Sequence, residues 1–211
     1  MSRRSREAPK PAPGTASPGT ASPVPGADGV PSTFPRVGRS APGYDVAQVD
    51  EFLARARRAY DGEGEAAGID AAAIRHTSFR MRRGGYSPSH VDAALERLED
   101  AFAARERERG VARMGQEAWL RQARDRAAEI TGRLSRPDGE KFRRVGRMSG
   151  GYDPAEVDRF LIRVQRFFAD NRPMSVDEVR QVVFRTRRGG YSEAQVDLLL
   201  DAVIDVMLAV R

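Results

Sequence analysis

Apolar residues recur at helical spacing in several segments of the chain, with polar residues between them. Three of these segments are apolar on one side only, and residues 196–210 are apolar on almost all sides except for three aspartates. A one-sided helix needs a partner, so we expect the helices to pack in pairs. The apolar positions of the one-sided segments are Val49, Phe52, Leu53 and Ala56; Val91, Leu95, Leu98 and Phe102; and Val157, Phe160, Leu161 and Val164.

Two further helices are expected between these segments, and one of the segments is expected to extend into a longer helix. The two further helices are short and run from Asp70 to about Arg80 and from Ser175 to about Arg185. The helix that begins at Ser87 is expected to continue through Gly110 to about Leu134, with the turn at residues 137–139 beyond it. Strand-like alternation is lacking along the chain, so the sequence predicts an all-α fold of tandem helix-turn-helix units forming helical pairs or short coiled coils.

A Gly-Tyr motif followed by Val-Asp occurs four times. Residues 34–60 align without gaps on residues 142–168, and we name these the A units. The segments "MRRGGYSPSHVD" (81–92) and "TRRGGYSEAQVD" (186–197) define the B units. The order A-B-A-B indicates the duplication of a two-unit module. The turn residues of the four motifs are Gly43, Tyr44, Gly85, Tyr86, Gly151, Tyr152, Gly190 and Tyr191.

Each Gly-Tyr turn is followed by the signals of a helix start. Asp45 with Gln48, Asp153 with Glu156, and Ser192 with Gln195 have the spacing of a capping box, as does Ser175 with Glu178. Pro88 and Pro154 suit a first helical position. The glycines are expected to turn the chain, and each tyrosine to fold back onto the helix that follows.

These signals predict three parts. Residues 1–33 contain seven of the thirteen prolines and repeat Pro-Gly-Thr-Ala-Ser, which is typical of a disordered tail. The first module is expected at residues 34–136 and the second at residues 137–211.

Charged residues suggest how the helices pair. The B helices carry acidic stripes, and the A helices carry arginines at exposed positions. Acids four residues apart repel mildly, which favours a basic partner over water alone. We hypothesise that Arg55, Arg58, Arg163 and Arg166 face the stripes formed by Asp92, Glu96, Asp100, Asp197, Asp201 and Asp205, while a solvated charged face remains an equal alternative for each pair.

Composition excludes several classes of protein. The 211 residues contain no cysteine, which removes disulfides, thiolate nucleophiles and most zinc sites. His76 and His90 do not recur in the second module, and Trp119 is expected to pack rather than bind a ligand. The aspartates that follow the tyrosines, such as Asp50 and Asp158, are interpreted as first-turn helix acids. We therefore expect no enzyme, catalytic residue, metal or cofactor. No apolar run of about 18 residues and no secretory signal are found, so a cytoplasmic location is expected.

The combination of Phe, a basic turn, Gly-Tyr, a helix cap, Val-Asp and Phe-Leu resembles the N-terminal domain of the DivIVA family, bacterial proteins that scaffold cell division and polar growth. The helix ending near Phe79 or Phe184, ahead of each B turn, is also similar to that family. The resemblance covers residues 34–102 and 142–211. It implies a non-enzymatic scaffold that self-associates, binds partners in the division or polar-growth machinery, and touches the membrane through a Phe and an Arg ahead of Gly-Tyr. This chain has no phenylalanine at those positions.

Arginines gather immediately before the turns and leave three hypotheses open. They serve the fold by capping helices and binding the acidic stripes, they contact anionic lipid headgroups at the inner face of the membrane, or they contact nucleic acid. The net charge of +6 keeps the last open, although acidic residues on the helix after each turn would repel phosphates. The candidate contact residues are Arg80, Arg82, Arg83, Arg143, Arg144, Arg147, Arg185, Arg187 and Arg188, with Met81 and Met148 as shallow apolar contacts.

Overall fold

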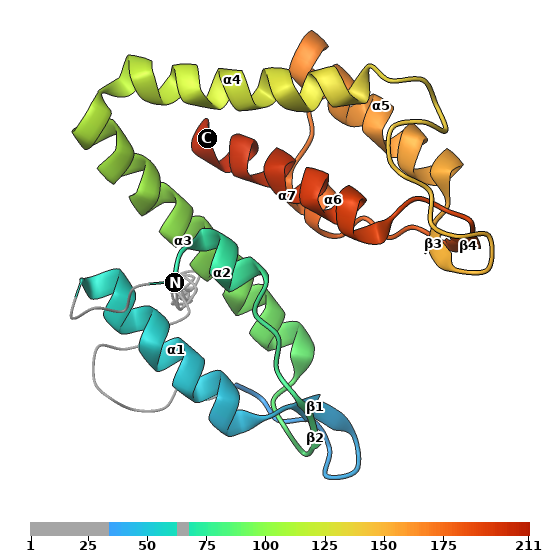
Figure 1. The fold of residues 1–211 in the computed structure, drawn as a ribbon. Coiled ribbons are helices and arrows are strands. Elements are labelled where there is room, and N and C mark those ends of the chain that lie inside the picture. Colours follow the sequence, from blue (N-terminus) through green and yellow to red (C-terminus); the bar gives the residue numbers. More distant parts are fainter. Residues whose placement is uncertain (1–33, 63–67) are drawn as a thin grey trace, which may run out of the picture. The chain divides into compact units, whose positions relative to one another are not determined.

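A computed structural model describes residues 34–62 and 68–211, so the predicted tail (1–33) lies outside the described residues (Figure 1). The described chain is mostly helical. Its helices are α1 (Val46–Asp61), α2 (Ala71–Arg75), α3 (Pro88–Met114), α4 (Gln116–Leu134), α5 (Pro154–Asp170), α6 (Val176–Arg180) and α7 (Glu193–Ala209). Its strands are β1 (Pro42–Tyr44), β2 (Met81–Arg83), β3 (Gly150–Tyr152) and β4 (Thr186–Arg188).

The strands correct the prediction of a purely helical fold. β1 pairs with β2 antiparallel, with Pro42 opposite Arg83, and β3 pairs with β4 in the same register, with Gly150 opposite Arg188. Each strand has only three residues, and together the strands consist of glycine, proline, tyrosine, arginine, threonine and one methionine. Such short, mostly exposed strands have no buried face to impose alternation, which is why the apolar pattern did not predict them.

The helices ahead of the B turns are shorter than predicted. α2 ends at Arg75 and α6 at Arg180, five residues before the expected ends at Arg80 and Arg185. After each helix the chain is extended and carries Phe79 or Phe184 into the core before it enters β2 or β4. A longer helix would remove the strand that pairs with the preceding A turn.

The helix expected from Ser87 to Leu134 is divided at Gly115. This residue has φ 84° and ψ 155°, and it separates the C-terminal end of α3 from the first residue of α4. Gly110, through which we expected the helix to continue, does lie inside α3 and is buried beneath the ring of Trp119. The two glycines together let the chain turn back on itself here.

The helix caps agree with the prediction in part. Asp45 accepts hydrogen bonds from the backbone N–H of Ala47 and Gln48, Asp153 accepts one from Ala155, and Ser175 with Glu178 forms a complete capping box. Ser192 makes no side-chain cap. The N3 side chains of α1, α5 and α7 were expected to return to their own N-caps, but they reach to another segment, as the site shows below.

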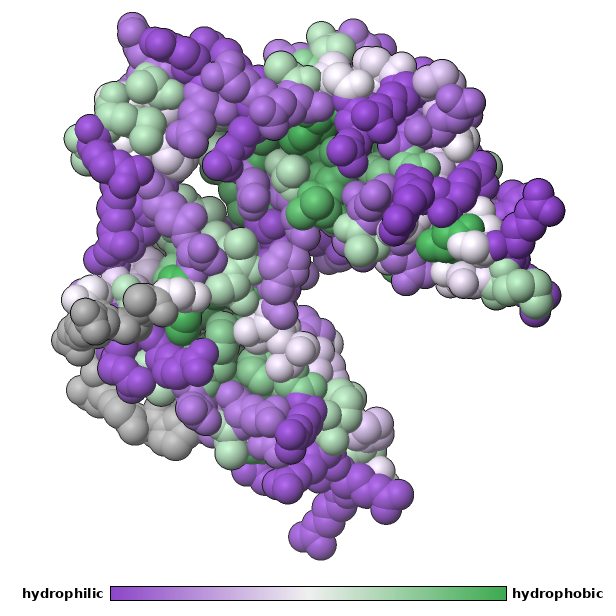
Figure 2. Space-filling view, viewed as in Figure 1, coloured by the Kyte–Doolittle hydropathy of each residue, from purple (hydrophilic) through white to green (hydrophobic). Residues whose placement is uncertain are grey.

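Apolar packing joins the helices through one large cluster. It contains Phe52 of α1, Ile74 of α2, Phe102 of α3 and many residues of α5 and α7, with Ile130 and Leu134 from α4. α4, which we assigned to the first module, thus packs against α5 and α7 of the second. Figure 2 shows hydrophobic side chains gathered between these helices. Within the described residues, no helix combines the length and apolarity needed to cross a membrane.

Candidate functional site: paired turns and a buried arginine clasp

Glycines allow the A and B turns to cross backbone to backbone. The N–H groups of Tyr44 and Tyr86 each donate to the carbonyl oxygen of the other at 2.9 Å, and Tyr152 and Tyr191 do the same at 3.0 and 2.8 Å. A Cβ on Gly43 or Gly190 would lie 2.5 Å from a carbonyl oxygen of the opposite segment, which is closer than atoms can approach. These positions therefore accept only glycine.

The first glycine of each B turn is required for a different reason. Gly84 and Gly189 have φ of 67° and 63°, in the left-handed region that side chains other than glycine disfavour. The B turns thus need glycine twice, once for the conformation and once for the close approach. The equivalent position of the first A turn is Pro42, which needs neither property.

The four tyrosines and the four following aspartates pair reciprocally between A and B units. Tyr86 of the first B turn donates to Asp50 of α1 at 3.1 Å, and Tyr191 of the second donates to Asp158 of α5 at 3.1 Å. The A-turn tyrosines point the other way. Burial and then the charge of the facing B-helix aspartate raise the pKa of both, with Asp92 beside Tyr44 and Asp197 beside Tyr152.

This exchange explains why the Gly-Tyr and Val-Asp elements occur together. A tyrosine does not bond the aspartate six residues after it, as a local motif would, but the aspartate of the paired unit. The hydroxyl groups therefore do not bond the helix that follows each tyrosine, although the ring of Tyr86 packs in one cluster with Val91 of its own helix and Val49 of α1. The aspartates, interpreted as first-turn helix acids, hold the crossed turns together.

Polar N3 side chains add a second link across each pair of units. Gln48 accepts from the backbone N–H of Arg80 at 2.9 Å, Glu156 from Arg185 at 2.8 Å, and Gln195 from Arg143 at 3.0 Å. The corresponding link between the first B helix and residue 35 is missing, because the residues at these two positions cannot form it. Pro35 stands in place of Arg143 and has no N–H, and His90 stands in place of Gln195 and bonds Ser87 instead.

The second module surrounds its B tyrosine more completely than the first. Tyr191 has no exposed surface, and the buried carboxylate of Asp158 also accepts from the backbone N–H of Gly139 at 2.6 Å. Burial raises the pKa of Tyr191 to about 12, with a further contribution from Asp158. Arg144 lies over the tyrosine ring at 5.1 Å and donates to the carbonyl oxygens of Gly139 and Gly189. Arg144 thus serves the fold.

The remaining candidate arginines divide by their partners. Arg82 lies 3.3 Å from the carboxylate of Asp45, Arg187 lies 3.6 Å from that of Asp153, and Arg185 pairs with Glu156. These partners are the N-cap and N3 acids of α1 and α5, and not the acidic stripes or helix C-termini that we had considered. The arginine side chains keep most of their surface exposed, at 75%, 63% and 87%.

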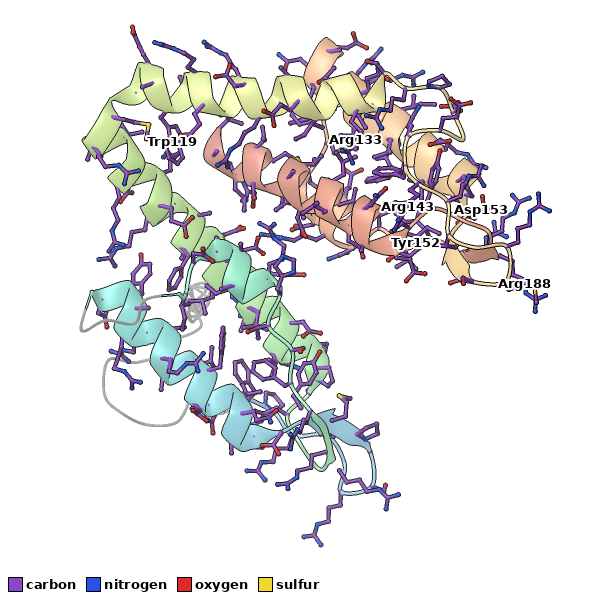
Figure 3. All side chains as sticks on the ribbon, in the orientation of Figure 1. Trp119, Arg133, Arg143, Tyr152, Asp153 and Arg188 are labelled. Carbon is purple, nitrogen blue, oxygen red and sulfur yellow. The ribbon has the colours of Figure 1, made fainter. Side chains whose placement is uncertain are left out.

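Two basic tips stand at the outer ends of the strand pairs. Arg39 and Arg83 lie beside Gly84 in the first, and Arg147 and Arg188 lie beside Gly189 in the second. Figure 3 shows Arg188 extending from the end of the β3–β4 pair. All nine candidate arginines are exposed. Two methionines near the strand pairs are also exposed: Met81, which begins β2 opposite Tyr44, at 54%, and Met148, in the turn before β3, at 84%.

The acidic stripes have partners that the sequence hypothesis did not name. Arg75, the last residue of α2, binds Glu99 at 2.8 Å, Asp205 at 2.8 Å and Asp201 at 3.4 Å. Arg180, the last residue of α6, binds Glu99 at 3.0 Å and Asp100 at 2.7 Å. We name these six residues the arginine clasp. Each arginine reaches an acidic residue in the other module.

The clasp is buried at its centre. The side chains of Arg75, Glu99 and Arg180 are exposed by only 10%, 3% and 8%. Burial lowers the pKa of Arg75, but its hydrogen bonds to Asp205 and Glu99 outweigh this, so the pKa lies above its usual value. Arg75 and Arg180 occupy equivalent places in the two modules, as do Asp100 and Asp205, whereas the place of Glu99 is taken by Ile204. One carboxylate therefore serves both arginines.

The hypothesis about the A-helix arginines is corrected accordingly. Arg163 pairs with Glu178 of α6, and Arg55 lies over the ring of Phe52. Among the ion pairs of residues 34–62 and 68–211, none joins Arg55, Arg58, Arg163 or Arg166 to the stripes, because α2 and α6 lie closer to the acids. Asp92 and Asp197 face tyrosines, and Glu96 is half-buried without an ion pair in that part of the chain.

Sequence reasoning missed Arg75, Arg180 and Glu99. A signal was present, since each arginine ends a short helix at the same place in the repeat, and Glu99 is the acidic residue that breaks the apolar face of α3. In the described part of the chain, no group of three or more acidic or histidine side chains could hold a metal ion.

Comparison of the chain with protein-family models, with curated proteins and with solved structures finds no match.

Proposed function

We propose that this protein is a non-enzymatic scaffold of the DivIVA type, built from a tandem duplication of an A-B module and recruited to the inner face of the cell membrane. One observation carries the proposal. The strand pairs expose arginines, and each module also exposes a methionine, Met81 at the start of β2 and Met148 in the turn before β3. A basic surface of this kind suits anionic lipid headgroups, each arginine contributing about 1 kcal/mol near a charged bilayer.

In this proposal arginine side chains contact the lipid, in place of the phenylalanine that the family resemblance implies. Met81 and Met148 supply a shallow apolar contact beside the charges. Binding of this kind is weak for one tip and stronger for two tips engaged together, because the second contact is then intramolecular. Partners in division or polar growth would bind a protein concentrated at the membrane in this way.

A nucleic-acid role through helix-turn-helix units is less well supported. The helix after the turn would have to enter a groove, and α7 is buried along most of its length, including Leu199, Val203 and Met207. Four acids of α3 and α7 are held in the arginine clasp, and the others on these helices would repel the phosphates.

Co-sedimentation with vesicles of anionic or neutral lipid tests the proposal. The test variant changes Arg82, Arg83, Arg187 and Arg188 to alanine, and the matched control changes the exposed Arg58, Arg121, Arg124 and Arg166, which lie on helices. We expect salt-sensitive binding to anionic vesicles only, lowered roughly a hundredfold or more in the test variant and much less in the control. If both variants lost vesicle binding equally, the binding would depend only on net charge. If the wild type did not bind anionic vesicles, the proposal would be contradicted.

A further inference from the structure

The corner between α3 and α4 has three features that act together. Gly115 adopts φ 84° and ψ 155°, a backbone conformation that is nearly confined to glycine. Gly110 lies directly under the ring of Trp119, where a Cβ would overlap the ring atoms. The indole N–H of Trp119 donates at 2.9 Å to the carbonyl oxygen of Ala209, near the end of α7.

The residues around this corner do not by themselves require a break. Ala112, Arg113 and Met114 before it, and Gln116, Glu117 and Ala118 after it, all favour helix, and a single glycine within such a run costs only about 1 kcal/mol relative to alanine. The break is therefore maintained by packing of Trp119 on Gly110. Without it, residues 88–134 would form one straight helix about 70 Å long, at 1.5 Å per residue.

The contacts that hold the two modules together lie on opposite sides of the corner. Arg75 comes before the corner in the sequence, and it binds Asp201 and Asp205, which come after the corner. Arg180 comes after the corner, and it binds Glu99 and Asp100, which come before it. A second copy of the chain carries the same residues. Every contact of the arginine clasp can therefore form between two chains as well as within one.

The clasp also selects which halves can pair. If two first modules paired, two Glu99 carboxylates would be buried together and would repel each other. If two second modules paired, Ile204 would stand at both positions of Glu99, so the buried arginines would lack their carboxylate. Only a first module with a second module supplies one Glu99 for two arginines. The pairing is specific for unlike halves, whether they belong to one chain or to two.

We propose that the α3–α4 corner is a hinge through which two copies of this chain exchange their second halves. In the closed monomer the corner is bent and one chain supplies both modules. In the exchanged dimer α3 and α4 are continuous, and residues 116–211 of each copy pair with residues 34–114 of the other. The proposal concerns assembly and does not depend on lipid binding.

Gly115→Ala tests the hinge, because alanine disfavours the bent conformation and favours the continuous helix. Gly132→Ala is the matched control, since Gly132 lies inside α4 with open space around it. Light scattering coupled to size exclusion should give a dimer for Gly115→Ala, with helix content retained, and a monomer for Gly132→Ala. The wild type should yield a dimer fraction when refolded at high protein concentration. A folded, monomeric Gly115→Ala would overturn the proposal, as would a wild type that refolds at high concentration without any dimer.

Charge exchange shows which halves meet. In the Gly115→Ala background, one chain carries Arg180→Glu and the other carries Glu99→Arg with Asp100→Arg, so each alone has a repulsive clasp. Mixed and refolded, the two should form a heterodimer that is at least tenfold enriched over either homodimer, because one of its two clasps is repaired and the other is wild type. A random distribution of dimers would contradict exchange of the second halves.

Discussion

The hydroxyl group of Tyr191 donates a hydrogen bond to the buried carboxylate of Asp158, thirty-three residues earlier in the chain. Tyr86 makes the same bond to Asp50, but this pair lies at a less enclosed place, because Asp50 is half-buried and Asp158 is exposed by only 4%. The paired bonds tie each B turn to the A helix of its own module. They are the strongest local reason for the recurrence of Gly-Tyr and Val-Asp.

The difference in burial predicts a difference in stability. Tyr191→Phe leaves a buried carboxylate with one fewer donor, so we expect a loss of about 2–3 kcal/mol in the free energy of unfolding. Tyr86→Phe should cost about 1 kcal/mol, because water can reach Asp50. Urea denaturation of the two variants checks the order, which would be contradicted by equal losses or by a larger loss at Tyr86.

Alkaline pH should weaken the fold through Tyr191. The folded protein holds the pKa of this hydroxyl at about 12, against an ordinary value of 10.0 that applies to the unfolded chain. The folded state therefore binds the proton more tightly, so the stabilisation is complete below pH 10 and is lost as pH rises toward 12. Between these values the free energy of unfolding should fall more steeply in the wild type than in Tyr191→Phe. Parallel pH profiles for the two proteins would contradict this assignment.

The arginine clasp should contribute far more to stability than an exposed ion pair. Changing both Arg75 and Arg180 to alanine leaves Glu99 buried without a cation, a situation that costs about 3–5 kcal/mol. Arg163→Ala, which removes an exposed pair with Glu178, should cost far less. Glu99→Gln in the double variant should recover part of the loss, because it removes the unpaired charge. Thermal or urea unfolding measures these differences in stability. If Glu99→Gln recovered no stability, Glu99 would not be the central carboxylate of the arginine clasp.

Replacing glycine with alanine should have opposite effects at the crossed turns and within a helix. Gly190→Ala places a methyl group against carbonyl oxygens of the opposite turn, so we expect loss of the β3–β4 pair and a destabilisation of several kcal/mol, above about 3. Gly132→Ala should stabilise α4 by about 0.5–1 kcal/mol. Hydrogen exchange at the N–H of Tyr152 and Tyr191 reports directly on the crossing, and unchanged protection in Gly190→Ala would contradict the packing described.

The apolar pattern predicted the faces of the long helices well. Val49, Val91, Val157 and Val196 have no exposed surface, since each begins the apolar face of a helix whose period of 3.6 residues is set by the backbone. The caps at Asp45 and Asp153 and the capping box at Ser175 were also predictable, because they depend on residues two or three apart in the sequence.

Long-range partners were not predictable from one sequence. The Gly-Tyr repeat identifies a turn, but only the fold shows that Tyr191 meets Asp158, and Tyr152 meets Asp197. The arginines of the clasp could not be identified because the chain contains many arginines, so many ion pairs were equally plausible from the sequence. The break at Gly115 needed Trp119 and Gly110 together, two residues that no helical period relates.

The measurement that tests the proposed function most directly places a fluorophore next to the arginines of each strand pair. The chain has no cysteine, so Met81→Cys and Met148→Cys can each be labelled alone with an environment-sensitive dye, and Ala104→Cys, on an exposed face of α3, provides the control. With anionic vesicles, we expect a blue shift and quenching by lipid-borne quencher at positions 81 and 148, reversed by salt, and no change at position 104. Unchanged emission at positions 81 and 148, or an equal shift at position 104, would contradict membrane contact through the basic tips.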